Sequence, residues 1–570
     1  MVANDICNLE FFTQFADINT PRSIEYGDIN SLEPSFGFSD FPAETEEHEG
    51  AMSLDIEESY TIQLQCPLKK ELWPHILSNG AEIENGIIKR SELSSRSVTS
   101  LCEIPLSPSL QDDSSILVEY YFKEVCGMMS CYDSDLNPYR TTISDSWSHS
   151  SSLYYIIQSM AVACLSEVSP GFSAASGHLR DKATRSLWDK KEEMEGDPSS
   201  LLALVMLGFS LCWHDPSKLG RSEFRLLAQT LSSLENQDRG QTIVDMEKRR
   251  FFHNSLVYWR MLLSFVTDSE PPCRGTTQAA QPQPANTSAQ GEVHMPHPQT
   301  GVGVEVHEVL AQVGALVRKE RMRIRQRRHS SRRDIEQSMK AIEAAEALHA
   351  RLCEIEFPQE DAVIGSGDDM TPTAHLLKTA EAYRCTGLLQ LYRNFPDLLV
   401  HNTSLIRRGA VSPALSNIAS CMDANRQDND DASASLNTWL TSLALHVLDL
   451  MECIPVSSRS RSIQPLLLVS ICSELSLNRS FTPVDGMSGN TVESIASSPR
   501  MKASPTVTDV LHARRLVIAR LSSFEGVLAA KPIRQMLALV KDTWVCMDTQ
   551  QEDVYWMDVM VEKGYETLMG

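Results

Sequence analysis

The sequence lacks the long apolar run and the leader that a membrane or secreted protein needs. Its longest apolar stretch, residues 201–213, is too short to cross the ~30 Å hydrocarbon core of a bilayer. Residues 1–20 contain no basic segment followed by an apolar one, so we expect no secretory signal. Acidic residues outnumber basic ones by 75 to 51, which disfavours a surface that wraps nucleic-acid phosphates as a whole. We therefore expect no membrane partner.

Clustered cysteines are also lacking. The closest of the 14 cysteines, Cys126 and Cys131, are separated by four residues, and no Cys-x-x-Cys occurs. A structural zinc ion needs about four ligands converging on one point, so this pattern predicts no zinc site and no other cofactor. Cysteines within apolar helical patterns, such as Cys164, Cys212 and Cys472, are instead predicted to be buried thiols. This usage is typical of a reducing compartment, the cytosol or the nucleus.

Catalytic motifs are missing as well. There is no phosphate-binding Gly-x-x-x-x-Gly-Lys-Ser/Thr loop, no Gly-x-Ser-x-Gly elbow and no paired-histidine zinc motif. The Asp pairs at 112–113, 368–369 and 430–431 lack a third carboxylate one helical turn later, which Mg²⁺ binding in helical synthases would require. We therefore predict that the chain is not an enzyme, with an unrecognised all-α enzyme as the disfavoured alternative.

Three histidines lie in conspicuous surroundings. His214 precedes Asp215, but neighbours in a helix do not face each other, so we predict a half-buried histidine at a helix C-terminus rather than a catalytic base. His294 and His297 lie in a segment rich in proline and glutamine, where we predict solvated side chains rather than metal ligands.

From Ser114 onward the sequence has helical periodicity. Apolar residues recur every three or four positions, Asp197-Pro198 marks a helix start, and Ser331 with Asp334 resembles a capping box. Helical patterns cover 153–165, 201–212, 241–266, 303–324, 331–352, 371–395, 439–453, 463–475, 507–524, 532–547 and 553–568. No strand series appears. The predicted fold is therefore all-α, a stack of antiparallel helices over 114–570, with a flexible linker at 271–302 and a flexible loop at 479–506.

Residues 1–113 are predicted to be largely disordered. The first 60 residues hold 14 acids and one base, without helical or strand periodicity. Phenylalanines lie between these acids, at Phe11, Phe12, Phe15, Phe36, Phe38 and Phe41. Acidic residues keep aromatic side chains in water and available to a partner's apolar groove, as in a transcriptional activation segment. An unselective disordered tail is the alternative.

A basic run occupies residues 318–333. It contains nine bases and one acid, and the bases are Arg318, Lys319, Arg321, Arg323, Arg325, Arg327, Arg328, Arg332 and Arg333. Three interpretations stay open: the solvated end of a helical hairpin paired with acids elsewhere, a nuclear-import signal, or a nucleic-acid contact.

Several strings resemble the fungal-specific transcription factor domain. They are Tyr120-Tyr-Phe-Lys-Glu-Val-Cys126, Asp135-Leu-Asn-Pro-Tyr-Arg140, Leu153-Tyr-Tyr-Ile-Ile-Gln-Ser-Met-Ala161, Met206-Leu-Gly-Phe-Ser-Leu-Cys-Trp-His-Asp-Pro216, Arg318-Lys-Glu-Arg-Met-Arg-Ile-Arg325, Thr371-Pro-Thr-Ala-His-Leu376, Ala380-Glu-Ala-Tyr-Arg-Cys-Thr-Gly-Leu-Leu-Gln-Leu-Tyr-Arg393, Phe395-Pro-Asp-Leu398, Ile454-Pro-Val-Ser-Ser-Arg-Ser-Arg461 and Gln464-Pro-Leu-Leu-Leu-Val469. The resemblance extends from about Ser114 to Tyr565.

This resemblance implies an all-α regulatory domain of a fungal zinc-cluster transcription factor, acting in the nucleus on transcription. It implies the transcription machinery or co-regulators as partners, promoter DNA through a six-cysteine zinc cluster, and a homodimer as one open assembly. Only Cys7, Cys66 and Cys102 precede the helical region, so the cluster is missing here and direct DNA binding is not expected. Either an upstream exon supplies the cluster, or the chain is an interaction or metabolite-sensing module that works through a DNA-binding partner.

Overall fold

The structure, a computed structural model, describes residues 113–189, 197–236, 243–268, 294–399, 431–477, 505–549 and 553–570. The six N-terminal phenylalanines, most of the predicted linker and most of the loop at 479–506 lie outside these ranges. The α-helices are α2 (Asp113–Tyr120), α3 (Thr141–Ser146), α4 (Ser151–Leu165), α5 (Ser173–Trp188), α6 (Pro198–His214), α7 (Arg221–Asn236), α8 (Ile243–Val266), α10 (Val304–Gln326), α11 (Arg332–Glu354), α12 (Thr373–Asn394), α15 (Asp431–Glu452), α16 (Pro465–Ser470), α17 (Val507–Glu525), α18 (Ala530–Asp548) and α19 (Trp556–Lys563). Short 3₁₀ or π turns lie between them, at Tyr121–Val125, Cys126–Met128, Pro170–Phe172, Glu360–Ala362, Arg459–Ile463 and Cys472–Glu474.

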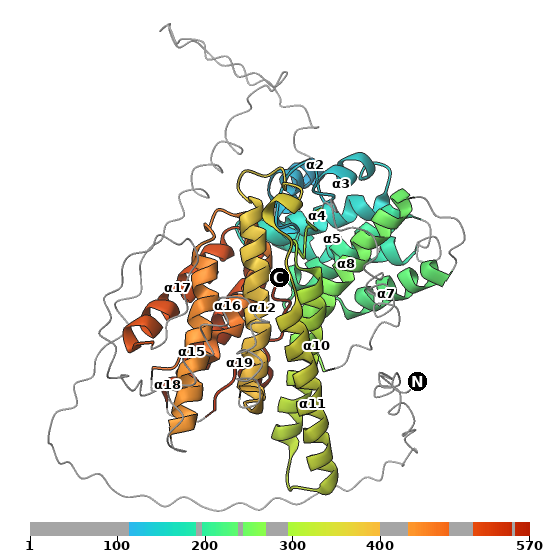
Figure 1. Cartoon of the computed structure of the whole chain (residues 1–570). Helices are drawn as coiled ribbons and strands as arrows, with labels where there is room; N and C mark the ends of the chain where they lie inside the picture. The colour runs from blue at the N-terminus through green and yellow to red at the C-terminus, as the bar shows by residue number, and fades with distance from the viewer. Residues whose placement is uncertain are drawn as a thin grey trace, which may run out of the picture. The chain divides into compact units, whose positions relative to one another are not determined.

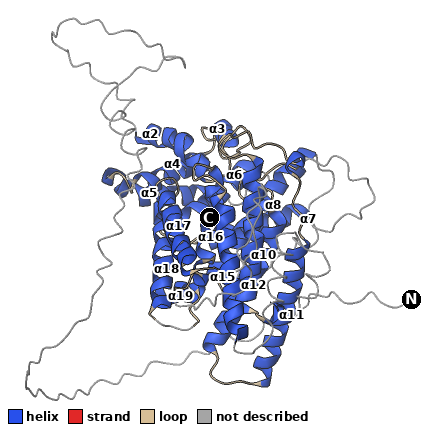
Figure 2. Ribbon diagram, turned by 60° about the vertical axis from the view of Figure 1, so that its left-hand side comes forward, coloured by secondary structure: helices blue, strands red, loops and turns tan. Residues whose placement is uncertain are grey.

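The predicted all-α class is confirmed for the described part of the chain (Figure 2). Extended pairing there is limited to two isolated bridges, His294 with Val363 and His297 with Gly301. No helix in the described ranges combines the length and the apolarity that crossing a bilayer requires.

Two helices begin directly after a side chain that accepts hydrogen bonds from free backbone N–H groups of the first turn. The Asp197 carboxylate accepts hydrogen bonds from the backbone N–H groups of Ser199 (3.0 Å) and Ser200 (3.1 Å), and Pro198 occupies the first helical position. Ser331 accepts from the backbone N–H of Asp334 (3.1 Å) and opens α11. Both predicted starts are confirmed.

Helices α4 to α8 form one part of the domain, and α10, α12 and α15 form a row beside it (Figure 1). Helix α6 is buried along almost its whole length, because it packs against α4, α5, α7, α8 and α18. Helix α8 contacts α10, α10 contacts α12, and α12 contacts α15, so the row is continuous with the first part. The last helices, α17 to α19, close the domain against α15, α16 and α6.

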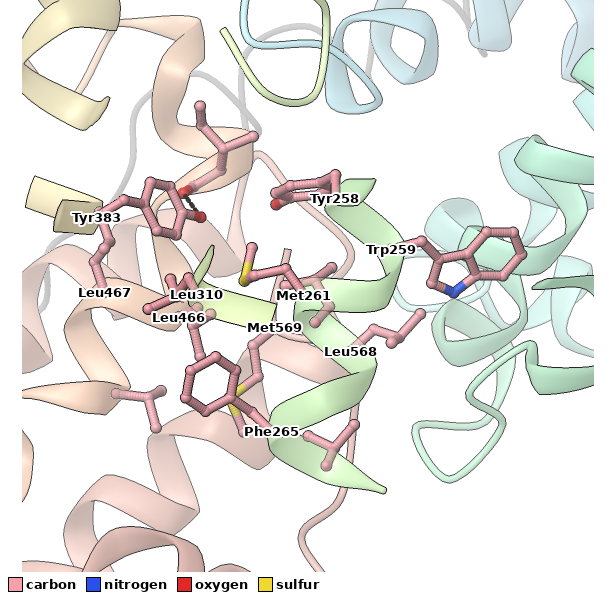
Figure 3. Packing of buried hydrophobic residues seen from close by; sticks show 14 of the residues in the cluster. Tyr258, Trp259, Met261, Phe265, Leu310, Tyr383, Leu466, Leu467, Leu568 and Met569 are labelled. Carbon is pink, nitrogen blue, oxygen red and sulfur yellow. Dashed lines mark hydrogen bonds between the residues drawn. The ribbon is translucent and has the colours of Figure 1, made fainter. Parts of the chain in front are cut away.

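One hydrophobic core runs through all of these helices, from Leu117 to Met569. Figure 3 shows Tyr258 and Phe265 of α8 beside Leu310 of α10 and the chain's penultimate residue, Met569. The backbone carbonyl of Met569 accepts a hydrogen bond from the backbone N–H of Leu466 (3.0 Å). Residues from the start and the end of the described chain therefore share one interior, which makes it a single folding unit.

One close contact between core helices depends on a glycine. Gly208 of α6 faces the indole ring of Trp259 of α8, and a Cβ atom at position 208 would overlap that ring. Trp259 is fully buried and also packs against Phe209 at a tilt of 33°, with the ring centroids 4.7 Å apart. The missing side chain at position 208 therefore lets a tryptophan lie against the backbone of its neighbouring helix.

The end of the expected linker is part of the fold. His294 pairs with Val363 and residues 296–301 are buried, so the predicted linker at 271–302 is too long at this end. His297 is 6% exposed, and the prediction of a solvated side chain was wrong for it. Its Nδ1 accepts from the N–H groups of Gln299 (3.2 Å) and Thr300 (3.3 Å), while its Nε2 donates to the carbonyl of Phe251 (3.1 Å). His294 is exposed, as expected.

Candidate functional site: the basic end of the α10–α11 hairpin

The basic run begins where α10 leaves the core. The first four turns of α10 bury Val306, Val309, Leu310, Val313 and Val317, all on the face that the sequence predicts. Arg318 follows directly after the last of these valines, and the apolar stripe then stops. Helices α10 and α11 form the predicted antiparallel hairpin, and its turn lies at one end of the row of helices (Figure 1).

The first arginine of the run caps the C-terminal end of α8. The Arg318 guanidinium donates to the Asp268 carboxylate (2.6 Å) and to the backbone carbonyl of Phe265 (3.2 Å), and its side chain is 8% exposed. A cation at this position satisfies a free carbonyl of the helix end and opposes the negative pole of the α8 dipole. Arg318 therefore has a structural partner.

Arg321 connects α10 to the last helix of the chain. Its Nε donates to Asp558 of α19 (2.9 Å), its Nη1 lies 3.3 Å from the Asp553 carboxylate, and its guanidinium lies 4.7 Å from the ring centroid of Tyr555. Burial would lower the pKa of Arg321, but Asp558 and Asp553 outweigh it and raise the pKa above its ordinary value. Arg325 adds a hydrogen bond to the backbone carbonyl of Asp558 (3.2 Å).

Arg323 joins the two arms of the hairpin. It donates to Glu320 of its own helix (2.6 Å), to the Ser338 hydroxyl (2.7 Å) and to the Asp334 carboxylate in the first turn of α11. Hydrogen bonding by Glu320 raises the pKa of Arg323. The first half of the basic run is therefore paired with acids, as one of the three interpretations expected.

The second half of the run is exposed. Every residue from Ile324 to Arg333 is solvent-exposed. Arg327 contacts Ser330 (2.7 Å) and lies 3.6 Å from Asp334, and Arg332 pairs with Glu336 (3.0 Å). Arg328 and Arg333 form no ion pair within the described ranges. The hairpin end therefore carries a surface, which we call the basic tip, made of Arg325, Arg327, Arg328, Arg332 and Arg333.

Exposed apolar side chains lie beside the basic tip on α11. Ile335 and Met339 lie within the predicted helical range 331–352 and continue its apolar spacing, yet they are 58% and 53% exposed. Only the second half of α11 packs, through Ala341, Ala345 and Leu352. The apolar residues of α11 keep their helical spacing in its first half, but no helix of the described chain covers the apolar side chains there.

A surface pocket of about 290 Å³ lies between α10 and α19. Met322, Arg325 and Val561 contribute to its lining, together with Arg321 and Asp558. Arg321 and Arg325 both pair with the single lining carboxylate, Asp558, so these charged side chains of the pocket already contact one another.

His214 is a structural residue. Its Nε2 lies 3.0 Å from the Ser159 hydroxyl and its Nδ1 lies 2.8 Å from that of Ser176, so α6, α4 and α5 meet at this ring. Burial lowers the pKa of His214 to about 4. The Asp215 carboxylate accepts instead from the Ser217 N–H (3.1 Å), so the two neighbours form no catalytic dyad.

The thiols do not fit a zinc cluster. The nine cysteines of the described ranges are all free, and no three His, Cys, Asp or Glu side chains there converge as metal ligands would. Burial raises the pKa of Cys131 and of Cys212 to about 12, whereas zinc binds thiolates. Cys7, Cys66 and Cys102 lie outside the described residues.

One charge network joins two of the strings that resemble the fungal domain, because Arg140 and Arg459 both pair with Asp133. Arg140 donates two hydrogen bonds to Asp133 (2.7 and 2.6 Å), and Arg459 lies 3.2 Å from Asp368, whose carboxylate accepts from the Asp133 N–H (2.9 Å). Burial pushes the pKa of Asp133 up, but hydrogen bonds from Arg140 and Asn137 outweigh it, and the net pKa lies below the ordinary value. Segments more than 200 residues apart are thus tied by one buried charge network.

Comparison with protein families gives one match. The model of the fungal specific transcription factor domain covers residues 115–570. Comparison with curated proteins gives no match, and neither does comparison with solved structures. The chain belongs to the fungal specific transcription factor domain family, which gives it a role in transcription regulation. This family consists of regulatory domains that are typically non-enzymatic.

Proposed function

We propose that this protein is a fungal transcription regulator that acts in the nucleus through its all-α domain, by binding co-regulators or the transcription machinery. The observation that carries this proposal is the family match over 115–570, which includes nearly all the described helices. The charge network around Asp133 supports it further, because it joins the string at 135–140 to the string at 454–461.

We also propose that contact with promoter DNA is made by a DNA-binding partner. The cysteines of the described ranges support this, because they do not converge and burial raises the pKa of Cys131, Cys212 and Cys472 to about 12, whereas a zinc-cluster module needs converging thiolates. The test is a binding assay with the purified 570-residue chain and a library of promoter fragments. Weak, sequence-independent binding is expected, and sequence-specific nanomolar binding would overturn this part of the proposal.

The regulatory activity can be tested without knowing the target genes. The full chain is fused to a heterologous sequence-specific DNA-binding domain and placed upstream of a reporter gene. We expect reporter transcription to change at least about fivefold, a ΔΔG of roughly 1 kcal/mol at the promoter. Alanine replacement of Phe11, Phe12 and Phe15 is expected to weaken activation if this segment contacts a co-regulator. Reporter output equal to that of the DNA-binding domain alone would contradict the regulatory function.

Nuclear import is assigned to the basic tip. Its exposed arginines can enter the acidic groove of an import receptor, whereas Arg318, Arg321 and Arg323 are paired within the domain. The test variant replaces Arg327, Arg328, Arg332 and Arg333 by Gln in a fluorescently tagged chain. The matched control replaces four exposed bases elsewhere, Lys218, Arg515, Lys541 and Lys563. Cytosolic retention of the first variant alone is expected, and nuclear accumulation of both would overturn the assignment.

A further inference from the structure

The loop at the end of the hairpin contains two serines between arginines. It runs from Arg327 to Ser331, and every residue in it is exposed. Arg327 and Arg328 stand three and two positions before Ser330, and no other Arg-Arg-x-Ser or Arg-Arg-x-Thr string occurs among the 570 residues. The backbone is extended at both ends of the loop, with ψ of 117° at Arg327 and of 161° at Ser331.

We propose that Ser330 is a phosphorylation site for a basophilic serine/threonine protein kinase, one whose substrate groove carries carboxylates for arginines at these two positions. Such a kinase needs an exposed acceptor, basic residues shortly before it and a segment that can become extended in its groove. The loop provides the first two, and its backbone is already extended at Arg327 and Ser331, with bends at Arg328 and His329 between them. The two serines differ, because Ser331 caps α11 through the Asp334 N–H, whereas the Ser330 hydroxyl is held only by Arg327 (2.7 Å). Ser330 is therefore the residue that can leave its contact without disturbing the helix.

The reaction is an ordinary phosphoryl transfer from ATP. The Ser330 hydroxyl oxygen forms a bond to the γ-phosphorus, and the bond from that phosphorus to the oxygen bridging the β-phosphate breaks. ADP leaves with the bonding electrons, and the hydroxyl proton passes to a carboxylate of the kinase. ATP and the kinase supply everything that this chain does not contain.

The phosphate would change the charge of the basic tip. It adds about −1.5 to −2 charges beside the tip arginines and offers three acceptor oxygens to their guanidinium groups. Arg328 and Arg332 are the nearest in sequence, two positions away on either side, and Arg327 already contacts the Ser330 oxygen. This regulatory consequence rests on the proposed function, since it holds only if the basic tip is the import signal. Phosphorylation would then hold the protein in the cytosol.

The modification is tested first on the purified full-length chain with Mg-ATP and a basophilic kinase. Cleavage after Glu320 and Glu336 releases peptide 321–336, and mass spectrometry of that peptide distinguishes Ser330 from Ser331. Phosphate on Ser330 is expected, at a rate that falls at least about tenfold in Arg327→Gln/Arg328→Gln and is unchanged within about twofold in Ser331→Ala. The matched control Arg332→Gln/Arg333→Gln removes the same charge after the acceptor, and its rate should equal that of the wild type.

Absence of phosphate on Ser330, phosphate on Ser331 instead, or an equal loss of rate in both double variants would overturn the site. Circular dichroism of each variant shows that the helices are retained. Localisation of Ser330→Glu and Ser330→Ala then tests the consequence: less nuclear signal is expected for the first and wild-type signal for the second. If the four-arginine variant still enters the nucleus, the proposed import role fails while the measured phosphorylation of Ser330 stands, so the two failures are distinguishable.

Discussion

Arg321 and Asp558 lie 237 positions apart in the chain and form one ion pair, with Arg321 Nε 2.9 Å from Asp558 Oδ2. The Arg321 side chain is 14% exposed and that of Asp558 is 23% exposed. The pair joins α19 to α10 at the point where the apolar stripe of α10 has ended. The ion pair therefore holds this part of α10 against its neighbour, as the buried valines do earlier in the same helix.

Arg321→Gln is expected to lower the free energy of unfolding by about 1–3 kcal/mol, because it leaves the partly buried Asp558 carboxylate with fewer donors. The measurement is urea denaturation of the full chain. Arg332→Gln is the control: its side chain is 93% exposed and pairs only within α11, so a change of at most about 0.5 kcal/mol is expected. Equal effects of the two substitutions would show that the α10–α19 pair contributes no more than a surface pair.

Most of the predicted helices are confirmed, because their apolar spacing and their caps are local properties of the chain. The range 463–475 is instead a short helix, α16, with 3₁₀ turns on both sides, and the range 553–568 is helical only over α19. Asp197 and Ser331 each satisfy N–H groups two or three residues away, so a few letters are enough to place these helix starts. The valine face of α10 was predicted in the same way. The family resemblance is confirmed over nearly the range the strings indicated.

Partners distant in sequence were not predictable from such local patterns. The acids that neutralise Arg318 and Arg321 come from residues 268 and 558, and no periodicity connects these positions. The same limit explains Met339, because the pattern marks an apolar face without saying which helix covers it. His297 was misjudged because the prolines and glutamines around it are typical of linkers, although its ring is held by three backbone groups.

Gly208→Ala is expected to destabilise the domain by several kcal/mol. Alanine favours a helix over glycine by about 1 kcal/mol, but here its methyl group would overlap the Trp259 ring and force both helices apart. Gly177→Ala in α5 is the matched control, since no atom lies within 4 Å of its added Cβ. We expect the control to raise the thermal midpoint slightly. A stabilising effect at position 208 would contradict the close packing of α6 on α8.

Stability is expected to fall as the pH is lowered from 7 towards 5. Burial lowers the pKa of His297 to about 3 and the pKa values of His214, His307 and His349 to about 4. In the unfolded chain these groups titrate near 6.5, so between about pH 6.5 and 4 the unfolded state binds more protons than the folded state. The contribution of these histidines to the free energy of unfolding is thus complete above pH 6.5, and it is lost as the pH falls through this window. Each residue can contribute up to about 2 kcal/mol of loss by pH 5.

Thermal midpoints measured in buffers from pH 7.5 to 5.0 test this dependence. His349→Gln should be less stable at pH 7.5, because it alters the contact of His349 Nε2 with the Tyr392 hydroxyl (2.7 Å), and should show a shallower dependence on pH. A thermal midpoint that stays constant from pH 7.5 to 5.0 would contradict the burial of these histidine rings.

Cysteine labelling tests the burial of the core directly. Burial raises the pKa of Cys212 and of Cys472 to about 12, whereas Cys453, at the end of α15, is exposed. Because the thiolate reacts and the thiol does not, we expect a maleimide at pH 7.5 to label Cys453 at least about a thousandfold faster than the two buried cysteines. Site-resolved mass spectrometry reports each rate separately, and labelling in urea should make the three rates similar. If Cys212 reacted as fast as Cys453 without urea, α6 could not be the buried helix around which α4, α5, α7, α8 and α18 are arranged.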